Sequence, residues 1–420
     1  MKRIVICLFV LVCLFLCGCG DSQGAALGNT VDATEHGVLP ENTPIENSKN
    51  LQRLIDSLSF EGGTVYLPRG VYRFAEGGSQ TIGSHCIKMR SNVGIKGDGD
   101  TTVLMPVGDS SAGLDMFYFN DYLDTGSPKY LERCRFEDFV IDGSETSSAT
   151  YTSAGKGFMF NLFRDCHWKR VTVKNTDATG FGVDCPVDST IVECRSENCG
   201  KAAKDESAGA SGFGIGFGYS DVESIRISDC TAVGNKKFGF FFEHQGRFDR
   251  AKYTATKGDF RVTGCEAEGN LHNFGGIFTL NTVYENCSSG GALKYGYYFE
   301  NSAVSTVLGS SSLGDADASF AVSYTGDAGP VDSVFGIEFV RSSSEDTLCG
   351  VRLINCGEPE KMSQNSVTLC SFRKVDSVAY AEGKIKSQTF SHNVAEGGVF
   401  DLSDSVEELV NSFNSWNLEP

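Results

Sequence analysis

Hydrophobic and polar residues alternate over short stretches of this chain, and long helical periodicity is nearly absent. The clearest stretch is "SGFGIGFGYSD" (residues 211–221), in which Gly212, Gly214, Gly216 and Gly218 take every second position. Because alternate residues of a strand face opposite sides, this segment predicts a strand with one apolar face and one face without side chains. Glycines in a strand usually mark the close approach of a ligand or of another backbone.

Two segments depart from the strand pattern and predict amphipathic helices. Residues 48–58 place Leu51, Leu54, Ile55 and Leu58 on one stripe, with Ser48 as the expected N-cap. The segment "SDSVEELVNSFNSW" near the C-terminus predicts a second helix. We expect these helices to cover the two ends of a strand-rich domain, because uncovered sheet edges invite edge-to-edge association.

A repeat becomes visible when the segments around five cysteines are compared. "RDCHW", "VECRSEN", "SDCTAVGN", "TGCEAEGN" and "ENCSSGG" each place a cysteine before a short polar turn, and most are followed by an aromatic and glycine-rich run. These cysteines lie 28, 36, 35 and 22 residues apart. Units of this size stack as a solenoid with strands about 4.8 Å apart. We therefore interpret the cysteines as small inward-facing residues; disulfides between rungs, including Cys194–Cys199, are the alternative.

The N-terminus predicts export. Lys2 and Arg3 precede a short apolar run, as in a secretory signal, and Leu16-Cys17-Gly18-Cys19 resembles a bacterial lipobox. We expect residues 1–19 to be a lipoprotein signal, Cys19 to be lipidated, and residues 20–30 to form a tether to the cell envelope. An ordinary signal peptide or an uncleaved anchor are the alternatives. The net charge of −18 argues against a nucleic-acid partner.

Further motifs resemble a known family. "GGTVYLPRGVYRF" (62–74), "SNVGIKGDGDTTVLMP" (91–106) and "FEDFVIDGS" (136–144) are similar to the first coils of pectate-lyase-like right-handed parallel β-helices. The resemblance implies an all-β solenoid: a single domain over 31–420, with coils over about 62–372 and a C-terminal segment over 373–420. The family contains polysaccharide lyases, glycoside hydrolases, uronate epimerases and non-enzymatic tailspikes, so the resemblance implies an extracellular polysaccharide partner without fixing the chemistry.

Candidate site residues follow from aligning the coils on an aromatic-glycine step. We align Phe181-Gly182, Phe213-Gly214, Phe238-Gly239, Phe274-Gly275 and Tyr295-Gly296. The outward positions then include Asp184, Glu243 and Glu300 as candidate catalytic carboxylates, beside a floor made by Gly214, Gly216 and Gly218. This alignment places Asp184 and Glu243 two rungs apart and offset along the strand. Phe241, Tyr219 and Tyr298 are candidate faces for sugar stacking.

A basic segment adjoins this strand. Seven lysines and arginines lie between Lys236 and Arg261, against only Glu243, Asp249 and Asp259. Arg247, Arg250 and Lys252 are therefore candidates to hold uronate carboxylates. His244 is a candidate acid or base, and Tyr253 a candidate substrate contact. A solvated surface loop is the alternative for the basic run, and a core or turn residue is the alternative for His244.

The middle coils also resemble mannuronan C5-epimerase and alginate-lyase-type modules, whose motif is Asp-Pro-His-Glu. Here the run is Asp184-Cys185-Pro186-Val187, so only Asp184 carries over. We expect lyase or C5-epimerase chemistry on a uronic-acid polysaccharide. Hydrolysis by two carboxylates and non-catalytic glycan binding are the alternatives. No cofactor is predicted firmly; calcium is an open possibility, although Asp184, Asp188 and Asp205 lack calcium-loop spacing.

Overall fold

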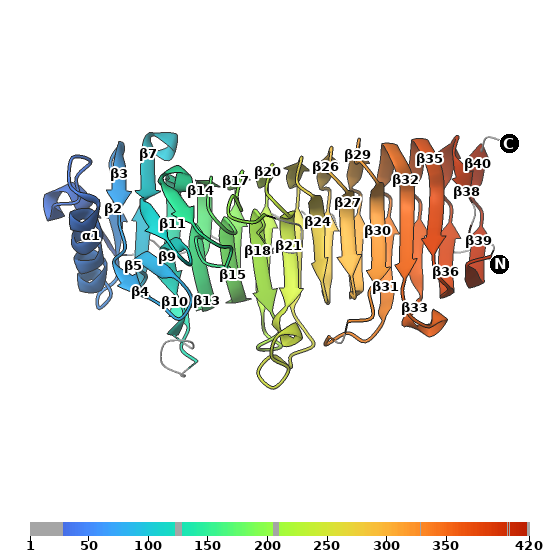
Figure 1. The fold of residues 1–420 in the computed structure, drawn as a ribbon, viewed down its shortest axis with the longest axis horizontal. Helices are drawn as coiled ribbons and strands as arrows, with labels where there is room; N and C mark the ends of the chain where they lie inside the picture. Colours follow the sequence, from blue (N-terminus) through green and yellow to red (C-terminus); the bar gives the residue numbers. More distant parts are fainter. Residues whose placement is uncertain are drawn as a thin grey trace, which may run out of the picture.

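A computed structural model describes residues 28–121, 128–204, 210–327, 329–400, 402 and 404–417. The molecule is elongated, and its coils follow one another along the long axis from the N-terminal to the C-terminal end (Figure 1). Its one α-helix in these residues, α1 (Pro44–Leu58), covers the N-terminal end and buries Leu51, Leu54 and Ile55. No helix in the described residues is long and apolar enough to cross a membrane.

Three parallel sheets run the length of the molecule, and each coil contributes a strand to each sheet. The first sheet, on which the candidate residues lie, contains β5 (Ser84–Lys88), β9 (Leu114–Phe119), β13 (Phe158–Arg164), β15 (Phe181–Val187), β18 (Phe213–Phe217), β21 (Phe238–His244), β24 (His272–Ile277), β27 (Tyr295–Glu300), β30 (Ala318–Tyr324), the later parts of β32 (Ser343–Asn355) and β35 (Ser371–Glu382), and β38 (Val399–Phe400).

The second and third sheets close the coils. The second contains β1 (Asn29–Asp32), β2 (Gly63–Tyr66), β6 (Val93–Lys96), the first parts of β11 (Arg135–Asp142) and β14 (His167–Lys174), then β16 (Ser189–Val192), β19 (Ser224–Ser228), β22 (Asp259–Thr263), β25 (Thr282–Glu285), β28 (Ala303–Leu308), β31 (Val334–Val340), β34 (Asn365–Thr368), β36 (Ile385–Ser391) and β39 (Val406–Ser412). The third contains β3 (Gly70–Phe74), β7 (Thr102–Pro106), the later parts of β11 and β14, then β17 (Arg195–Glu197), β20 (Thr231–Val233), β23 (Glu266–Glu268), β26 (Ser288–Gly290), β29 (Ser311–Leu313), the first parts of β32 and β35, β37 (Val394–Glu396) and β40 (Ser415–Asn417).

Short elements lie at the edges and in the connections of these sheets. They are β4 (Gly78–Ser79), β10 (Leu131–Glu132), β33 (Met362–Ser363), the separate pair β8 (Gly108–Ser110) and β12 (Thr146–Ser148), and the 3₁₀ turns η1 (Ala33–His36), η2 (Gly99–Thr101), η3 (Gly143–Glu145), η4 (Gln245–Arg247) and η5 (Pro359–Lys361). Successive parallel strands that wind into stacked coils make this a parallel β-helix, as the sequence predicted.

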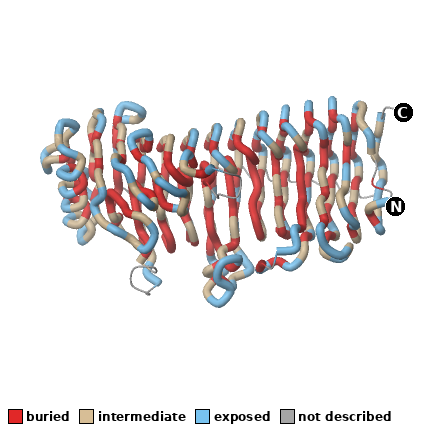
Figure 2. The backbone as a smooth tube through the Cα atoms, in the orientation of Figure 1, coloured by how far each residue is buried: buried red, intermediate tan, exposed pale blue. Residues whose placement is uncertain are grey.

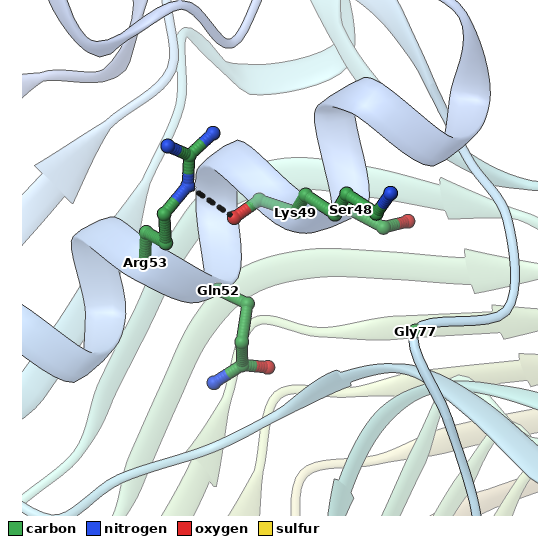
Figure 3. A pocket seen from close by; sticks show the side chains of 5 residues that line it. All are labelled: Ser48, Lys49, Gln52, Arg53 and Gly77. Atoms are coloured by element: carbon green, nitrogen blue, oxygen red, sulfur yellow. Dashed lines mark hydrogen bonds between the residues drawn. The ribbon is translucent and has the colours of Figure 1, made fainter.

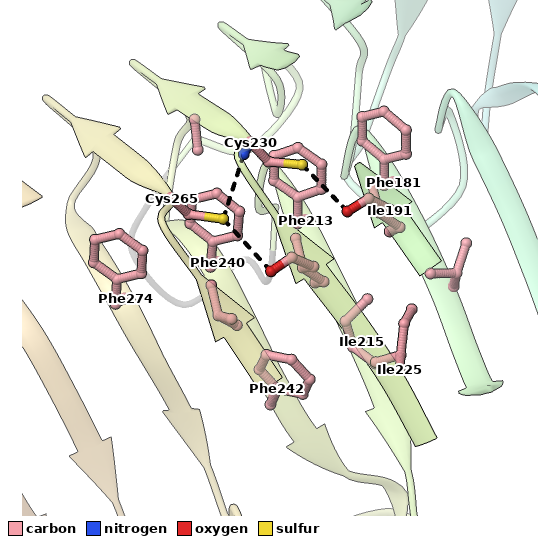
Figure 4. Packing of buried hydrophobic residues seen from close by; sticks show 14 of the residues in the cluster. Phe181, Ile191, Phe213, Ile215, Ile225, Cys230, Phe240, Phe242, Cys265 and Phe274 are labelled. Carbon is pink, nitrogen blue, oxygen red and sulfur yellow. Dashed lines mark hydrogen bonds between the residues drawn. The ribbon is translucent and has the colours of Figure 1, made fainter. Parts of the chain in front are cut away.

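Buried segments recur along the stacked coils (Figure 2). Because each coil repeats the environment of the last, similar residues form ladders in the interior. Phe181, Phe213 and Phe240 stack with ring centroids 4.7 Å apart at each step, and Phe274 continues the ladder at 5.1 Å (Figure 4). These spacings match the distance between neighbouring strands, so ring stacking and backbone pairing stabilise the same register.

A second ladder contains the cysteines of the repeat, which are free and buried. The Cys194 backbone N–H donates to Cys230 Sγ at 3.3 Å, and the Cys230 N–H donates to Cys265 Sγ at 3.4 Å. In later coils, Ser310 and Ser342 accept the equivalent backbone bonds. The position therefore requires a small side chain that accepts a backbone hydrogen bond at a buried corner of the coil. The cysteines are thus hydrogen-bond acceptors as well as small residues of the core. All twelve cysteines of the described residues, including Cys194 and Cys199, are unpaired thiols.

Two helix expectations are corrected. The C-terminal segment is not a helix: β39 and β40 pair in parallel with β36 and β37, so the coils continue past Phe372 to Asn417. Over so short a stretch its apolar residues fit both the helical and the strand period, and the open edge of the preceding coil supplies the hydrogen bonds that favour a strand.

The N-terminal helix begins at Pro44 with a Thr43–Glu46 capping box. Ser48 lies inside the helix, where its hydroxyl donates to the Ala75 carbonyl.

Candidate functional site

The backbone register brings three predicted carboxylates onto one line across the first sheet. Asp184 pairs with Gly216, Gly216 with Glu243, Glu243 with Ile277, and Ile277 with Glu300. We refer to this row of outward positions as the carboxylate line. Asp184 and Glu243 are thus two rungs apart at the same level, with about 10 Å between their backbones.

The expected offset between Asp184 and Glu243 was wrong, because two coils were aligned two residues out of register. Phe213 pairs with Phe240 rather than Phe238, and Phe274 pairs with Tyr297 rather than Tyr295. Each of the two coils has aromatic residues two positions apart, Phe238 and Phe240 in one and Tyr295 and Tyr297 in the other, so the sequence pattern fits either register. The register is set by backbone pairing between strands, which the order of side chains does not reveal.

Asp184 explains one of the glycines in the "GFGIGFG" strand. Its Oδ1 accepts the Gly216 backbone N–H at 2.8 Å, and a Cβ on Gly216 would lie 2.7 Å from Asp184 Cγ and 2.5 Å from Gln245 Nε2. Glycine is therefore required because the Asp184 carboxylate and the Gln245 amide occupy the space of its side chain. Burial raises the pKa of Asp184, although the nearby Lys156 charge opposes the shift.

The neighbouring glycines make room in the same way. Gly218 has φ 112° and lies under the His244 imidazole, whose Nε2 would be 2.6 Å from a Cβ there. Gly214 lies against the Thr179 methyl group, at 3.1 Å from its would-be Cβ. The glycine strand is consequently covered at Gly216 and Gly218 by side chains of the protein itself, and the expectation of a bare floor there is corrected.

Glu243 is the most unusual titratable group of the carboxylate line. Its side chain is 15% exposed and its Oε1 lies 3.4 Å from Arg247 Nη1. Burial raises its pKa to about 7, the negative charge of Asp184 adds to that shift, and Arg247 and Lys237 oppose it. A carboxyl group that titrates near neutral pH can act as either an acid or a base under ordinary conditions.

Two lysines beside these carboxylates were not predicted from the sequence. The Lys156 side chain lies across Gly182, where its Cε and Nζ would be 2.9 Å from a Cβ, and its charge lowers the pKa of Asp184. Lys237 immediately precedes β21, and its charge lowers the pKa of Glu243. Lys156 belongs to the connection between β12 and β13, outside the repeat, so no periodic signal could have placed it.

A third missed residue is Tyr151, in the same connection as Lys156. Burial raises its pKa to about 12, and the charge of Glu243 contributes to the shift. The phenol is therefore protonated at neutral pH and lies within electrostatic range of Glu243. Asn161 precedes Asp184 on the carboxylate line. The site thus combines two carboxyl groups, three cations and a phenol drawn from separate coils and connections.

The basic segment after β21 contributes mainly Arg247. This guanidinium links Glu243 to Asp327, 3.8 Å away, and lies over the Phe278 ring. Arg250 instead donates to the Gly329 carbonyl, which ties this segment to the connection between β30 and β31; both project from the same edge of the molecule (Figure 1). Arg250 is thus directed away from the carboxylates.

Lys252, Tyr253 and Tyr219 form a group on the flank of the site. Lys252 Nζ lies 4.8 Å from the centre of the Tyr253 ring, and the two tyrosine rings are 6.5 Å apart in an edge-to-face arrangement. Tyr253 packs with Leu162 and Cys185 and is buried. Their contacts fix the basic segment against β13, β15 and the turn after β18.

His244 is held inside this segment. It is 1% exposed; its Nδ1 accepts the Gly246 N–H at 2.9 Å, and its Nε2 donates to the Ala255 carbonyl at 2.7 Å. Burial lowers its pKa, which favours this neutral, doubly bonded form. His244 therefore shapes the segment that carries Arg247 and Gln245, and its ring nitrogens are not directed at the carboxylate line.

Glu300 and the predicted stacking residues lie further along the same face. The Tyr298 hydroxyl donates to Glu300 Oε2 at 2.9 Å. Tyr298 belongs to an outward aromatic group with Phe238, Phe241, His272 and Tyr295. Phe241 is nearly buried within it, whereas Tyr298 is partly exposed.

Two further features bear on ligand and metal binding. A hollow of about 350 Å³ lies beside α1 and is lined by Ser48, Lys49, Gln52, Arg53 and Gly77 (Figure 3). It is at the N-terminal end, far along the axis from the carboxylate line. No cluster of three or more histidine, cysteine, aspartate or glutamate residues suited to a metal occurs in the described parts of the chain. Calcium binding stays a prediction.

Comparison with known proteins agrees with the fold. No protein-family model and no curated relative matches the chain. Among solved structures, the A-module of Azotobacter vinelandii mannuronan C-5 epimerase AlgE6 is 16% identical, with a TM-score of 0.60 over 87% of this chain and 99% of that one. The tailspike of E. coli bacteriophage HK620, solved with a pentasaccharide, is 15% identical, with a TM-score of 0.62 over 91% and 70%. These likenesses establish a right-handed parallel β-helix.

Proposed function

We propose that this protein acts on an extracellular polysaccharide that contains uronic acids, by lyase or C5-epimerase chemistry at Asp184 and Glu243. The observation that carries the proposal is Glu243: a carboxyl group with a pKa of about 7, two rungs from Asp184, with Arg247, Lys237 and Lys156 around the pair. The clustering of Arg247, Lys237 and Lys156 beside Asp184 and Glu243, in a chain of net charge −18, favours an acidic sugar at this place, and Asp327 pairs with Arg247 from the outer side.

In the proposed reaction, ionised Glu243 removes the proton at C5 of a uronate residue. The carboxylate of that residue lies among Arg247, Lys237 and Lys156, which stabilise the negative charge that develops as the C5–H bond breaks. In β-elimination, the C4–O bond then breaks and the departing oxygen takes a proton from Tyr151 or protonated Asp184. In epimerisation, Glu243 keeps the proton that it has removed, and C5 receives a different proton on its opposite face from Tyr151 or protonated Asp184.

Hydrolysis is the second candidate, and the spacing of the carboxylates favours it. Asp184 and Glu243 lie at the same level with about 10 Å between backbones, from which side chains can reach the ~6.5–9.5 Å separation of inverting glycosidases. In that reaction, protonated Glu243 donates to the glycosidic oxygen and Asp184 activates water.

The deciding experiment incubates the soluble chain from Asp21 onward with polyuronates and neutral glycans. Ultraviolet absorbance reports the unsaturated ends made by a lyase, a reducing-sugar assay reports hydrolysis, and NMR reports epimerisation. We expect new absorbance or inverted C5 centres on a polyuronate. Reducing ends without absorbance would favour hydrolysis, and glycan binding without any reaction would favour a non-catalytic surface protein.

The pH dependence of the rate separates the two chemistries. If Glu243 is the base, kcat/KM rises as pH increases through about 7, because the ionised form is active. If Glu243 is the acid, kcat/KM falls over the same interval. Glu243→Gln serves as the control, since it should abolish whichever limb belongs to this group.

For location, we propose that Cys19 is lipidated and holds the β-helix at the cell envelope. This residue lies outside the described residues, and the proposal stands on the lipobox-like sequence alone. Labelling with a fatty-acid analogue tests it: a wild-type chain that stays unlabelled, or a Cys19→Ser variant that stays labelled, would contradict it.

A further inference from the structure

A second group of charged and aromatic side chains lies on the first sheet toward its C-terminal end. We call four of these residues the distal patch: Asp317, which immediately precedes β30, Arg352 on β32, and Tyr380 and Glu382 at the end of β35. Arg352 donates to Asp317 through Nη1 and to Glu382 through Nη2. Its guanidinium carbon lies 5.9 Å from the centre of the Tyr380 ring.

The backbone register places the distal patch on the same rows as the candidate site. The carboxylate line continues from Glu300 through Ser323 and Ile354 to Glu382. The adjacent outward row continues from Tyr298 through Ala321 to Arg352 and Tyr380. Arg352 is four rungs beyond Glu243, or about 19 Å, and Tyr380 is five rungs beyond it, or about 24 Å.

Two members of the distal patch are partly exposed to solvent. Tyr380 is 48% exposed and the Glu382 side chain 43%, so a flat aromatic face and free carboxylate lone pairs meet solvent together. Exposed ion pairs add little to stability, and an exposed ring leaves apolar surface in water. The same composition is well suited to a sugar. The ring face packs on C–H groups, guanidinium N–H groups donate to sugar oxygens, and carboxylates accept from hydroxyls.

Partly exposed side chains lie between the two places. Tyr298 and Glu300 lie on the intervening strand β27, and the Lys294 ammonium lies 5.1 Å from the centre of the buried Tyr295 ring. We infer that the distal patch is a remote sugar-binding subsite, at which one polysaccharide chain that occupies the Asp184–Glu243 site is also held. This inference rests on the proposed function, and it predicts a preference for long chains over short ones.

The test compares oligouronates too short to extend beyond the Asp184–Glu243 site with chains long enough to reach Tyr380. Arg352→Ala and Tyr380→Ala should each weaken binding of long chains by about tenfold and leave short chains unchanged. Binding is measured by calorimetry on the Glu243→Gln background, which prevents turnover. Arg373→Ala is the matched control: Arg373 is also on β35 and paired with Glu345, but it lies on the third sheet. It should change neither affinity.

The outcomes separate this inference from the proposed chemistry. One outcome is that the parent protein binds long polysaccharides without turnover and that the patch variants lose this binding. That outcome would support the subsite and contradict the proposed chemistry. If turnover occurs but the patch variants bind long and short chains as the parent does, or weaken both equally, the subsite is overturned. Absence of binding to any long acidic chain also overturns it.

Discussion

Glu243 and Glu223 are two carboxyl groups with the same perturbed titration and opposite surroundings. Burial raises the pKa of each to about 7. Glu223 is 1% exposed, and its oxygens accept the backbone N–H groups of Gly218, Tyr219 and Ser220 at 2.6, 3.0 and 3.1 Å. Glu243 accepts one long bond, from Arg247. The first carboxyl closes a turn, and the second has lone pairs left for a substrate.

This difference shows that a raised pKa by itself does not mark a catalytic group. Structural and functional carboxyls are both buried, and burial alone accounts for most of each shift. The two groups differ in their hydrogen bonds, because Glu223 accepts three backbone N–H groups of the turn at residues 218–220. The basic segment bonds to the same turn: the Ala255 N–H donates to the Gly218 carbonyl, and the N–H groups of Thr256 and Lys257 donate to Asp221. Glu223 therefore supports the segment that carries Arg247, and Glu243 faces the place where a substrate would lie.

The largest expected effect tests the functional side of this comparison. Glu243→Gln should lower kcat by 10²–10⁴-fold, roughly the contribution of a positioned acid or base, and should not lower stability, because no backbone donor depends on this side chain. Turnover on the identified polysaccharide and urea denaturation are measured on the same preparation. Turnover at the parent rate would remove Glu243 from the mechanism.

Glu223→Gln should have the converse effect. An amide presents one acceptor oxygen to three N–H groups, so we expect the free energy of unfolding to fall by about 1–3 kcal/mol. The midpoint of urea denaturation measures it, with Glu243→Gln as the matched control. Equal midpoints for the two variants would show that the distinction drawn from hydrogen bonding is wrong.

Gly216→Ala sharpens the comparison at the Asp184 side. The new methyl group would displace the Asp184 carboxylate or the Gln245 amide, and we expect turnover to fall by about tenfold with a loss of roughly 1 kcal/mol in stability. Gly214→Ala, whose methyl meets only Thr179 Cγ2 at 3.1 Å, should be milder in both assays. The reverse order would mean that Gly214 rather than Gly216 lies at the substrate.

The smallest expected effect concerns pH. Glu223 and Glu243 have a folded pKa of about 7, and burial also raises the pKa of Asp115 and Asp315 to about 6. These four carboxyl groups therefore hold more protons in the native state than in the unfolded chain between about pH 4 and 7, so their contribution to stability should decline as pH rises through that interval. Denaturant titrations at several pH values measure the slope. Each glutamine variant should remove the share of this decline that belongs to its own group, and a pH dependence that neither variant changes would contradict these shifts.

The sequence predicted the repeating fold more completely than it predicted the candidate site. The cysteine spacing and the "GGTVYLPRGVYRF" segment predicted the parallel β-helix, because a solenoid imposes the same environment on every coil and so repeats residue types. The same periodicity brought Asp184, Glu243 and Glu300 forward as outward carboxylates. It failed at the C-terminus, where residues 406–417 fit a helix or a strand equally well until the edge of β36 and β37 is present.

The sequence by itself determined the stacked coils, the inward ladders and the outward face on which the candidate residues lie, since side-chain parity depends only on position along a strand. Tertiary structure alone decided the register between coils, which moved Glu243 onto the line of Asp184. It also decided that Lys156 and Tyr151 approach that line and that His244 turns away from it. The positions of Lys156, Tyr151 and His244 depend on how non-repeating connections fold back onto the coils, and no local sequence pattern determines which residues these connections contact.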